Sequence, residues 1–203
     1  MNAAETMLLP LLIGIGHSLE VDHLVAVSNL VDIRGEWTKQ ATKGATWGLG
    51  HTISVVLAAA GIGFLRMLFG PEQHWPFEIL VGIMLLVIGL VKLRNALGKE
   101  FTHGDVPSKK VFFQVGLVHG LAGSGAVAAL LSGHVSTTLD QCLFLAWFGI
   151  GTIVGMGAIA AVITRLQLFK HSFVHVYSIL IASISVIYGL TILYQQTLKP
   201  FLS

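Results

Sequence analysis

The residues best suited to chemistry lie close together near the start of the chain, inside apolar sequence. His17, Glu20, Asp22 and His23 fall within one stretch of seven residues that contains no Lys or Arg. Imidazole and carboxylate groups are ligands for nickel, cobalt, copper and zinc in proteins. A charged side chain at the centre of a membrane helix costs about 2.5–3.5 kcal/mol. A bound or passing cation is therefore the expected counter-charge for the two acids.

The spacing of these residues limits how they can share a site. At about 100° per residue, His17, Glu20 and His23 share one face of a regular helix, whereas Asp22 falls nearly opposite Glu20. Two alternatives stay open. The helix is unwound near 14–16, which would turn Asp22 toward the site, or Asp22 orients a histidine ring or faces another helix.

Two further histidines lie inside other apolar segments. His51 is in the second segment and His119 in the fourth, and glycines beside both allow close helix contact. A bundle of the first, second and fourth segments would bring both rings to His17 and His23. The alternative, a histidine that only hydrogen-bonds a neighbouring helix, stays open for His51 and His119. Secondary candidates are the neighbouring hydroxyl residues Thr52, Ser54 and Ser124.

Six apolar segments must position these side chains. Hydrophobic residues make up 54% of the 203 residues and charged residues 11%, against about 25% charged in soluble domains. A helix of about 20 apolar residues crosses the hydrocarbon core of a membrane, and continuous runs of this length exclude alternating barrel strands. The third segment extends to 97 if Lys92 and Arg94 reach toward the membrane surface. We predict an all-α membrane protein with six transmembrane helices at about 7–31, 44–65, 77–91, 112–133, 139–163 and 173–194.

Basic residues predict the orientation of these helices. Ten of the twelve Lys and Arg residues follow the first, third and fifth segments. The positive-inside rule then places those loops in the cytoplasm and both termini outside, in a bacterial cytoplasmic (inner) membrane. No basic residue precedes the first apolar run, so we expect a retained helix rather than a cleaved signal peptide.

The chain also contains an internal repeat with an offset near 100 residues. Three pairs of stretches are similar: 14–19 and 116–121, 47–50 and 147–151, and 87–90 and 186–190. Because each half holds three helices, the halves would insert in opposite directions, as in many transporters. We predict one transmembrane domain over 1–203, with repeat one at 7–97, a cytoplasmic loop at 98–111 and repeat two at 112–198.

Three motifs resemble those of known metal permeases. The stretch 17–23, His-Ser-Leu-Glu-Val-Asp-His, fits the H-x4-D-H signature of the NiCoT family of nickel/cobalt permeases, and 49–52 is similar to its L-G-H-[ST] element. The stretch 119–124 resembles the H-G-L-A-G-S element of the shorter UreH-type urease-accessory membrane proteins of the same superfamily. Typical NiCoT permeases are longer and have a G-H-S third motif, so the resemblance points to the UreH-type branch.

The resemblance implies metal-ion transport, with His17, Asp22 and His23 on the metal path and His51 and His119 as partners. We therefore expect transmembrane transport of Ni²⁺ or Co²⁺ as cargo, with no permanently bound cofactor. The expected partners are the lipid bilayer, the divalent ion and metalloenzyme maturation proteins. With a net charge of +2 and no basic stripe with aromatics, nucleic acid is excluded.

Two other functions stay open. One is a membrane accessory protein for metalloenzyme maturation that transports nothing. The other is a small-anion exporter, although anion sites use basic residues or helix N-termini and the predicted helices have no basic residue in their interiors. We expect no enzymatic activity, because His17 and His23 are six residues apart rather than four as in H-E-x-x-H. The single cysteine, Cys142, excludes an internal disulfide.

Overall fold

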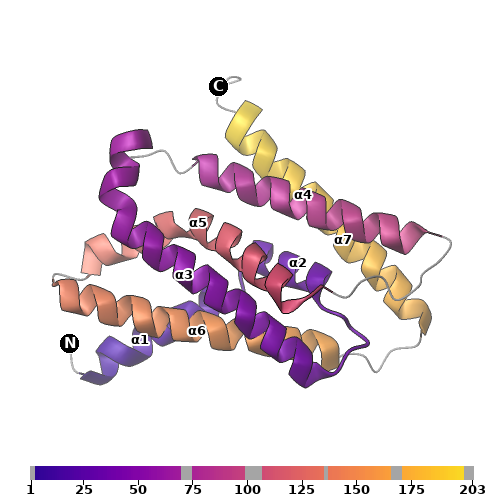
Figure 1. Cartoon of the computed structure of the whole chain (residues 1–203), viewed down its shortest axis with the longest axis horizontal. Coiled ribbons are helices and arrows are strands. Elements are labelled where there is room, and N and C mark those ends of the chain that lie inside the picture. The colour runs from indigo at the N-terminus through magenta and orange to yellow at the C-terminus, as the bar shows by residue number, and fades with distance from the viewer. Residues whose placement is uncertain (1–2, 70–74, 99–106, 135–136, 166–170, 199–203) are drawn as a thin grey trace.

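Every regular element in the described part of the chain is a helix (Figure 1). The computed structural model describes residues 3–69, 75–98, 107–134, 137–165 and 171–198, without the side chains of 3–6, 62–69, 75–76, 123–134 and 171–173. The helices are α1 (Ala3–His17), α2 (Val21–Leu30), α3 (Trp37–Phe69), α4 (Trp75–Leu97), α5 (Lys109–His134), α6 (Thr138–Arg165) and α7 (His171–Leu193), followed by a π-helical turn at Tyr194–Leu198. The all-α prediction is confirmed for these residues.

The first predicted transmembrane helix is broken in two. The segment 7–17 of α1 meets α2 at an angle of 62°. Two turn hydrogen bonds close the break, from the Leu19 amide to Gly16 O (3.0 Å) and from the Glu20 amide to His17 O (3.1 Å). Glu20 then has extended backbone angles and is the N-cap residue of α2. Unwinding near 14–16 was one of the two open alternatives, and the break lies just after those residues.

Two helices in the described part of the chain are long and apolar enough to cross a membrane by themselves. They are α6 and the helical stretch Val174–Leu198. The bent pair of α1 and α2 is a third if it counts as one span. The presence of six transmembrane helices, the orientation of the termini and the domain boundaries stay predictions.

The third predicted segment takes its longer form, because α4 continues to Leu97. The Lys92 side chain is partly buried, and its ammonium donates hydrogen bonds to carbonyl oxygens at the end of α2. This contact joins α4 to the carboxyl end of α2.

Four helix pairs account for most of the packing. They are α3 with α5, α3 with α6, α4 with α7, and α1 with α6. In Figure 1, α4 and α7 lie together on one side of the molecule, and the other pairs form its second part. The larger buried apolar cluster includes Trp47, Leu85, Phe112 and Met156, and thus joins α3, α4, α5 and α6.

Close backbone contacts recur at the repeat offset of about 100 residues. A Cβ added to Gly14 would collide with the carbonyl oxygen of Phe148, where α1 meets α6. A Cβ added to Gly116 would collide with the carbonyl oxygen of Trp47, where α5 meets α3. Each residue of the second contact is about 100 positions away from its counterpart in the first, so α1 packs on α6 as α5 packs on α3.

The substitution Gly116→Ala is expected to lower the thermal unfolding midpoint of the detergent-solubilised protein. The added methyl group has no room against Trp47 O, and overpacking of this kind costs about 1–3 kcal/mol, or roughly 2–10 °C at this chain length. The matched control is Gly61→Ala in α3, whose Cβ would have no heavy atom within 4 Å. Because alanine favours a helix over glycine by about 1 kcal/mol, a midpoint for Gly116→Ala at or above that of Gly61→Ala would contradict the tight contact.

Candidate metal centre

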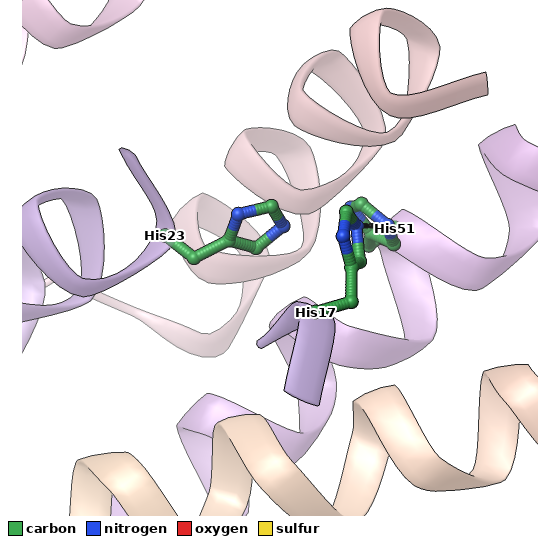
Figure 2. A group of neighbouring side chains, drawn as sticks. All are labelled: His17, His23 and His51. Carbon is green, nitrogen blue, oxygen red and sulfur yellow. Dashed lines mark hydrogen bonds between the residues drawn. The ribbon is translucent and has the colours of Figure 1, made fainter. Parts of the chain in front are cut away.

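Three histidines from three helices meet in the bundle. His17 is the last residue of α1, His23 lies in the first turn of α2, and His51 lies within α3. Figure 2 shows the three rings turned toward one another. The His17 ring centroid lies 4.6 Å from that of His23 and 5.1 Å from that of His51, and the latter two are 5.1 Å apart. All three residues are buried, and one ring nitrogen from each lies within 4.8 Å of the others.

The ring of His17 is held by Glu20, a residue of the break between α1 and α2. Its Nδ1 donates to Glu20 Oε1 at 2.8 Å, which leaves the lone pair on Nε2 in a neutral ring. That Nε2 lies 3.2 Å from Nε2 of His51. Two nitrogens bound at about 2.0–2.1 Å to one tetrahedral ion would be about 3.3 Å apart, so this pair already has the spacing of metal ligands.

Asp22 joins two histidines through its two carboxylate oxygens. Oδ1 accepts from Nδ1 of His23 at 2.9 Å, and Oδ2 accepts from Nε2 of His119 in α5 at 2.9 Å. Nδ1 of His23 thus holds the hydrogen, and the lone pair remains on its Nε2. That buried Nε2 has no hydrogen-bond partner among the described residues. Carboxylates that orient metal-binding imidazoles in this way are common in metal sites.

A second group of potential ligands shares His23 with the first. Asp22, His23 and His119 also place one ligand atom each within 4.8 Å of one another. Nδ1 of His119 is buried without a partner in the described part of the chain. The structure therefore brings together five of the six predicted ligands. The exception is Glu20, which is exposed, contacts His17 and belongs to neither group.

Two of the secondary candidates, Thr52 and Ser54, hydrogen-bond the backbone. The Thr52 hydroxyl donates to Gly48 O at 2.8 Å, and the Ser54 hydroxyl donates to His51 O at 2.9 Å. Both hydroxyls thus bond backbone carbonyls of α3 rather than ligand atoms. Ser124 belongs to α5, and its side chain lies outside the described residues.

Trp47 is a site residue that the sequence analysis did not select. Its side chain is fully buried. The Trp47 ring stacks on the His23 ring with 5.7 Å between centroids, and it meets the His119 ring edge-on with 5.6 Å between centroids. Phe148 of α6 similarly contacts the ring of His17 at 5.4 Å. Trp47 lies four residues before His51 and so on the same face of α3, which is the signal that could have identified it.

The charged groups at the centre are the carboxylates of Asp22 and Glu20. The ion-pair partners of Asp22 and Glu20 in the described part of the chain are histidines, which carry charge only when protonated. Neutral imidazoles leave the carboxylate charges uncompensated in an apolar bundle. A divalent cation seated among the imidazole nitrogens would offset them.

Comparisons with known proteins agree with the motifs. The urease accessory protein UreH of Bacillus sp. (strain TB-90) is 29% identical over 159 residues, which cover 71% of this chain and 69% of UreH. This chain is a relative of UreH. The resemblance of the three motifs to the nickel/cobalt permease superfamily, UreH-type branch, is thereby confirmed. No family model matches the chain, and no solved structure matches it.

Two plant proteins are similar beside UreH. Chloroplast protein FOR GROWTH AND FERTILITY 1 of Arabidopsis thaliana is 28% identical over 179 residues, covering 75% of this chain and 47% of the plant protein. FOR GROWTH AND FERTILITY 2 is 28% identical over 157 residues, covering 68% of this chain and 41% of its own length. This UreH-like chain thus spans less than half the length of either plant protein.

The substitution His23→Ala is expected to weaken nickel binding by at least ~10-fold, because it removes an open buried nitrogen that both groups share. Isothermal titration of the detergent-solubilised protein with Ni²⁺ measures the effect. The matched control is His175→Ala, which changes an exposed histidine of α7 that belongs to neither group. Equal losses in both variants would show that nickel binds elsewhere.

The substitution Asp22→Asn is expected to weaken Co²⁺ binding by about 10–100-fold, because an amide cannot hold both histidine rings as the carboxylate does. Glu20→Gln makes the same chemical change at an exposed acid that contacts a single histidine, and a smaller loss is expected. Visible absorption of bound Co²⁺ follows both titrations. An Asp22→Asn variant that binds as tightly as Glu20→Gln would contradict the orienting role of Asp22.

Proposed function

We propose that this protein carries a divalent transition-metal ion, nickel or cobalt, across the membrane. The observation that supports this most is the meeting of the His17, His23 and His51 rings from three helices inside an apolar bundle. Buried histidines with open nitrogens and no basic neighbour have little structural use by themselves, because an unpaired buried polar atom costs about 1–3 kcal/mol. An ion that binds and leaves gives those nitrogens a partner.

The ligand types favour an ion such as nickel, cobalt, copper(II) or zinc over harder or softer ions. Magnesium and calcium take oxygen ligands, whereas the group of His17, His23 and His51 consists of three imidazoles. Thiolate ligands select copper(I) and iron–sulfur clusters, and the one cysteine, Cys142, is exposed on α6 and not part of either group. The relationship to a urease accessory protein favours nickel as the cargo.

The proposal includes six membrane crossings in a bacterial cytoplasmic (inner) membrane, with both termini outside. The α1–α2 pair forms the first crossing and α3 to α7 form the other five. Two inverted halves are supported by the recurring contacts: Gly14 faces Phe148 as Gly116 faces Trp47, about 100 residues later. Transport would follow from rocking of the halves about the histidine site between them.

A second function is a membrane accessory protein that holds nickel for a maturation partner without moving it across the bilayer. The similarity to UreH, a urease accessory protein, favours this alternative specifically. Both functions use the same metal centre. They differ in whether the ion leaves on the opposite side of the membrane.

Flux of Ni²⁺ and Co²⁺ into proteoliposomes, followed with an enclosed metal-sensitive dye, separates the two functions. We expect flux in the parent protein and in His175→Ala, and at least a ~10-fold lower rate in His23→Ala, since the site loses its shared ligand. Absence of flux in a parent protein that binds nickel would overturn the permease and favour the accessory function. Equal flux in His23→Ala and the parent would place the path elsewhere.

A further inference from the structure

Lys92 of α4 reaches the carboxyl end of α2. Its ammonium donates to the carbonyl oxygens of Ser28 at 3.0 Å and Asn29 at 2.9 Å. The last backbone bond of α2 runs from the Val31 amide to Val27 O at 2.9 Å. The carbonyls after Val27 therefore have no donor within the helix, and Lys92 supplies the hydrogens that two of them lack.

Two further features of the surroundings suit an ammonium at this place. The carboxyl end of a helix carries partial negative charge, which a cation stabilises. The ring centroid of Tyr177 in α7 lies 5.8 Å from the Lys92 nitrogen, within the range of a cation–π contact. Two carbonyl oxygens of α2 and one aromatic ring of α7 thus contact the ammonium of Lys92.

The short helix α2 is held by its buried apolar residues and by contacts at its carboxyl end. It has ten residues, and its N-cap residue, Glu20, makes no side-chain cap hydrogen bond. Isolated helices shorter than about 12–15 residues are marginal in water. At its carboxyl end, Lys92 and a 3.4 Å hydrogen bond from Asn29 to Ile181 O tie it to α4 and α7.

One end of α2 carries potential ligands, and the other end contacts Lys92. Asp22 and His23 lie in the first turn, and the carbonyls that Lys92 contacts lie in the last, roughly 10 Å away along the axis. A shift of α2 along or about its axis would move the His23 nitrogen relative to His17 and His51. Lys92 belongs to neither group of potential ligands, but it contacts the helix that carries two of them.

We propose that Lys92 is a positioning residue for the metal centre: by holding the carboxyl end of α2, it places His23 and Asp22 at its amino end in register with His17 and His51. This inference rests on the proposed function, since it concerns the same metal centre. It adds a residue from α4, a helix that supplies no ligand to either group.

The test compares Lys92→Met with Lys92→Arg and with Arg94→Met. Methionine keeps the length of the side chain and loses the charge and donors, whereas arginine restores both. Arg94 is an exposed residue of the same helix, so its replacement controls for loss of one positive charge. Co²⁺ affinity and the visible absorption spectrum of bound Co²⁺ are measured on the folded, monodisperse fraction of the full chain in detergent.

Lys92→Met is expected to weaken Co²⁺ binding by about 10-fold, in the range of lost supporting contacts at metal sites, and to change the Co²⁺ spectrum. Lys92→Arg should recover most of the affinity, and Arg94→Met should match the parent. A purely structural role would lower the unfolding midpoint and leave the affinity and spectrum of the folded fraction unchanged. That result would overturn the inference.

Lys92→Gln covers the case in which Lys92→Met does not fold. Its neutral amide is a shorter donor, and we expect an intermediate affinity with an altered spectrum. Parent-like binding in Lys92→Gln would then overturn the positioning role by itself. A parent protein that binds neither Co²⁺ nor Ni²⁺ would overturn the proposed function and this inference with it, whereas a parent that binds while all Lys92 variants bind equally would overturn only the inference.

Discussion

The metal centre depends on the break between α1 and α2. In an unbroken helix Asp22 would lie nearly opposite Glu20, and its carboxylate could not reach the rings that surround His17. The 62° bend separates the two histidines onto two helices and turns Asp22 toward α5, where it contacts His119 at 2.9 Å. The break leaves backbone groups without helical partners, and the turn hydrogen bonds from the Leu19 and Glu20 amides satisfy two of the carbonyls.

The second requirement is close approach of those neighbours. Imidazoles extend only a few ångström from their backbones, so rings from α1, α3 and α5 can meet only if the helices nearly touch. Glycines at the crossings allow this: Gly116 lies against Trp47 O and Gly120 against His51 O. Any larger residue there would push His119 away from Asp22. Small residues are the usual means of close packing between membrane helices, and here they also determine the ligand geometry.

Much of the fold could be predicted from apolar length and charge, whereas the details of the site could not. Hydropathy gives the helices at 139–163 and 173–194 within a few residues of α6 and α7, because burial in lipid demands long apolar runs. The motif at 17–23 predicted the ligand types. The bridge made by Asp22 and the target of Lys92 depend on residues 60 to 100 positions away. Local periodicity carries no information about such partners.

The repeat gives the two halves unequal parts in the site. His17 and His119 occupy equivalent places, each three residues after a tightly packed glycine, Gly14 or Gly116. Yet α1 ends at His17, whereas α5 continues past His119 to His134. The first half adds Asp22 and His23 after its break, and the second half has Ser124 and Gly125 at the matching positions. His17 therefore belongs to the three-imidazole group. His119 instead contacts Asp22, the carboxylate that orients His23. The packing contacts recur at equivalent positions, whereas four of the five clustered ligands, His17, Asp22, His23 and His51, precede residue 98.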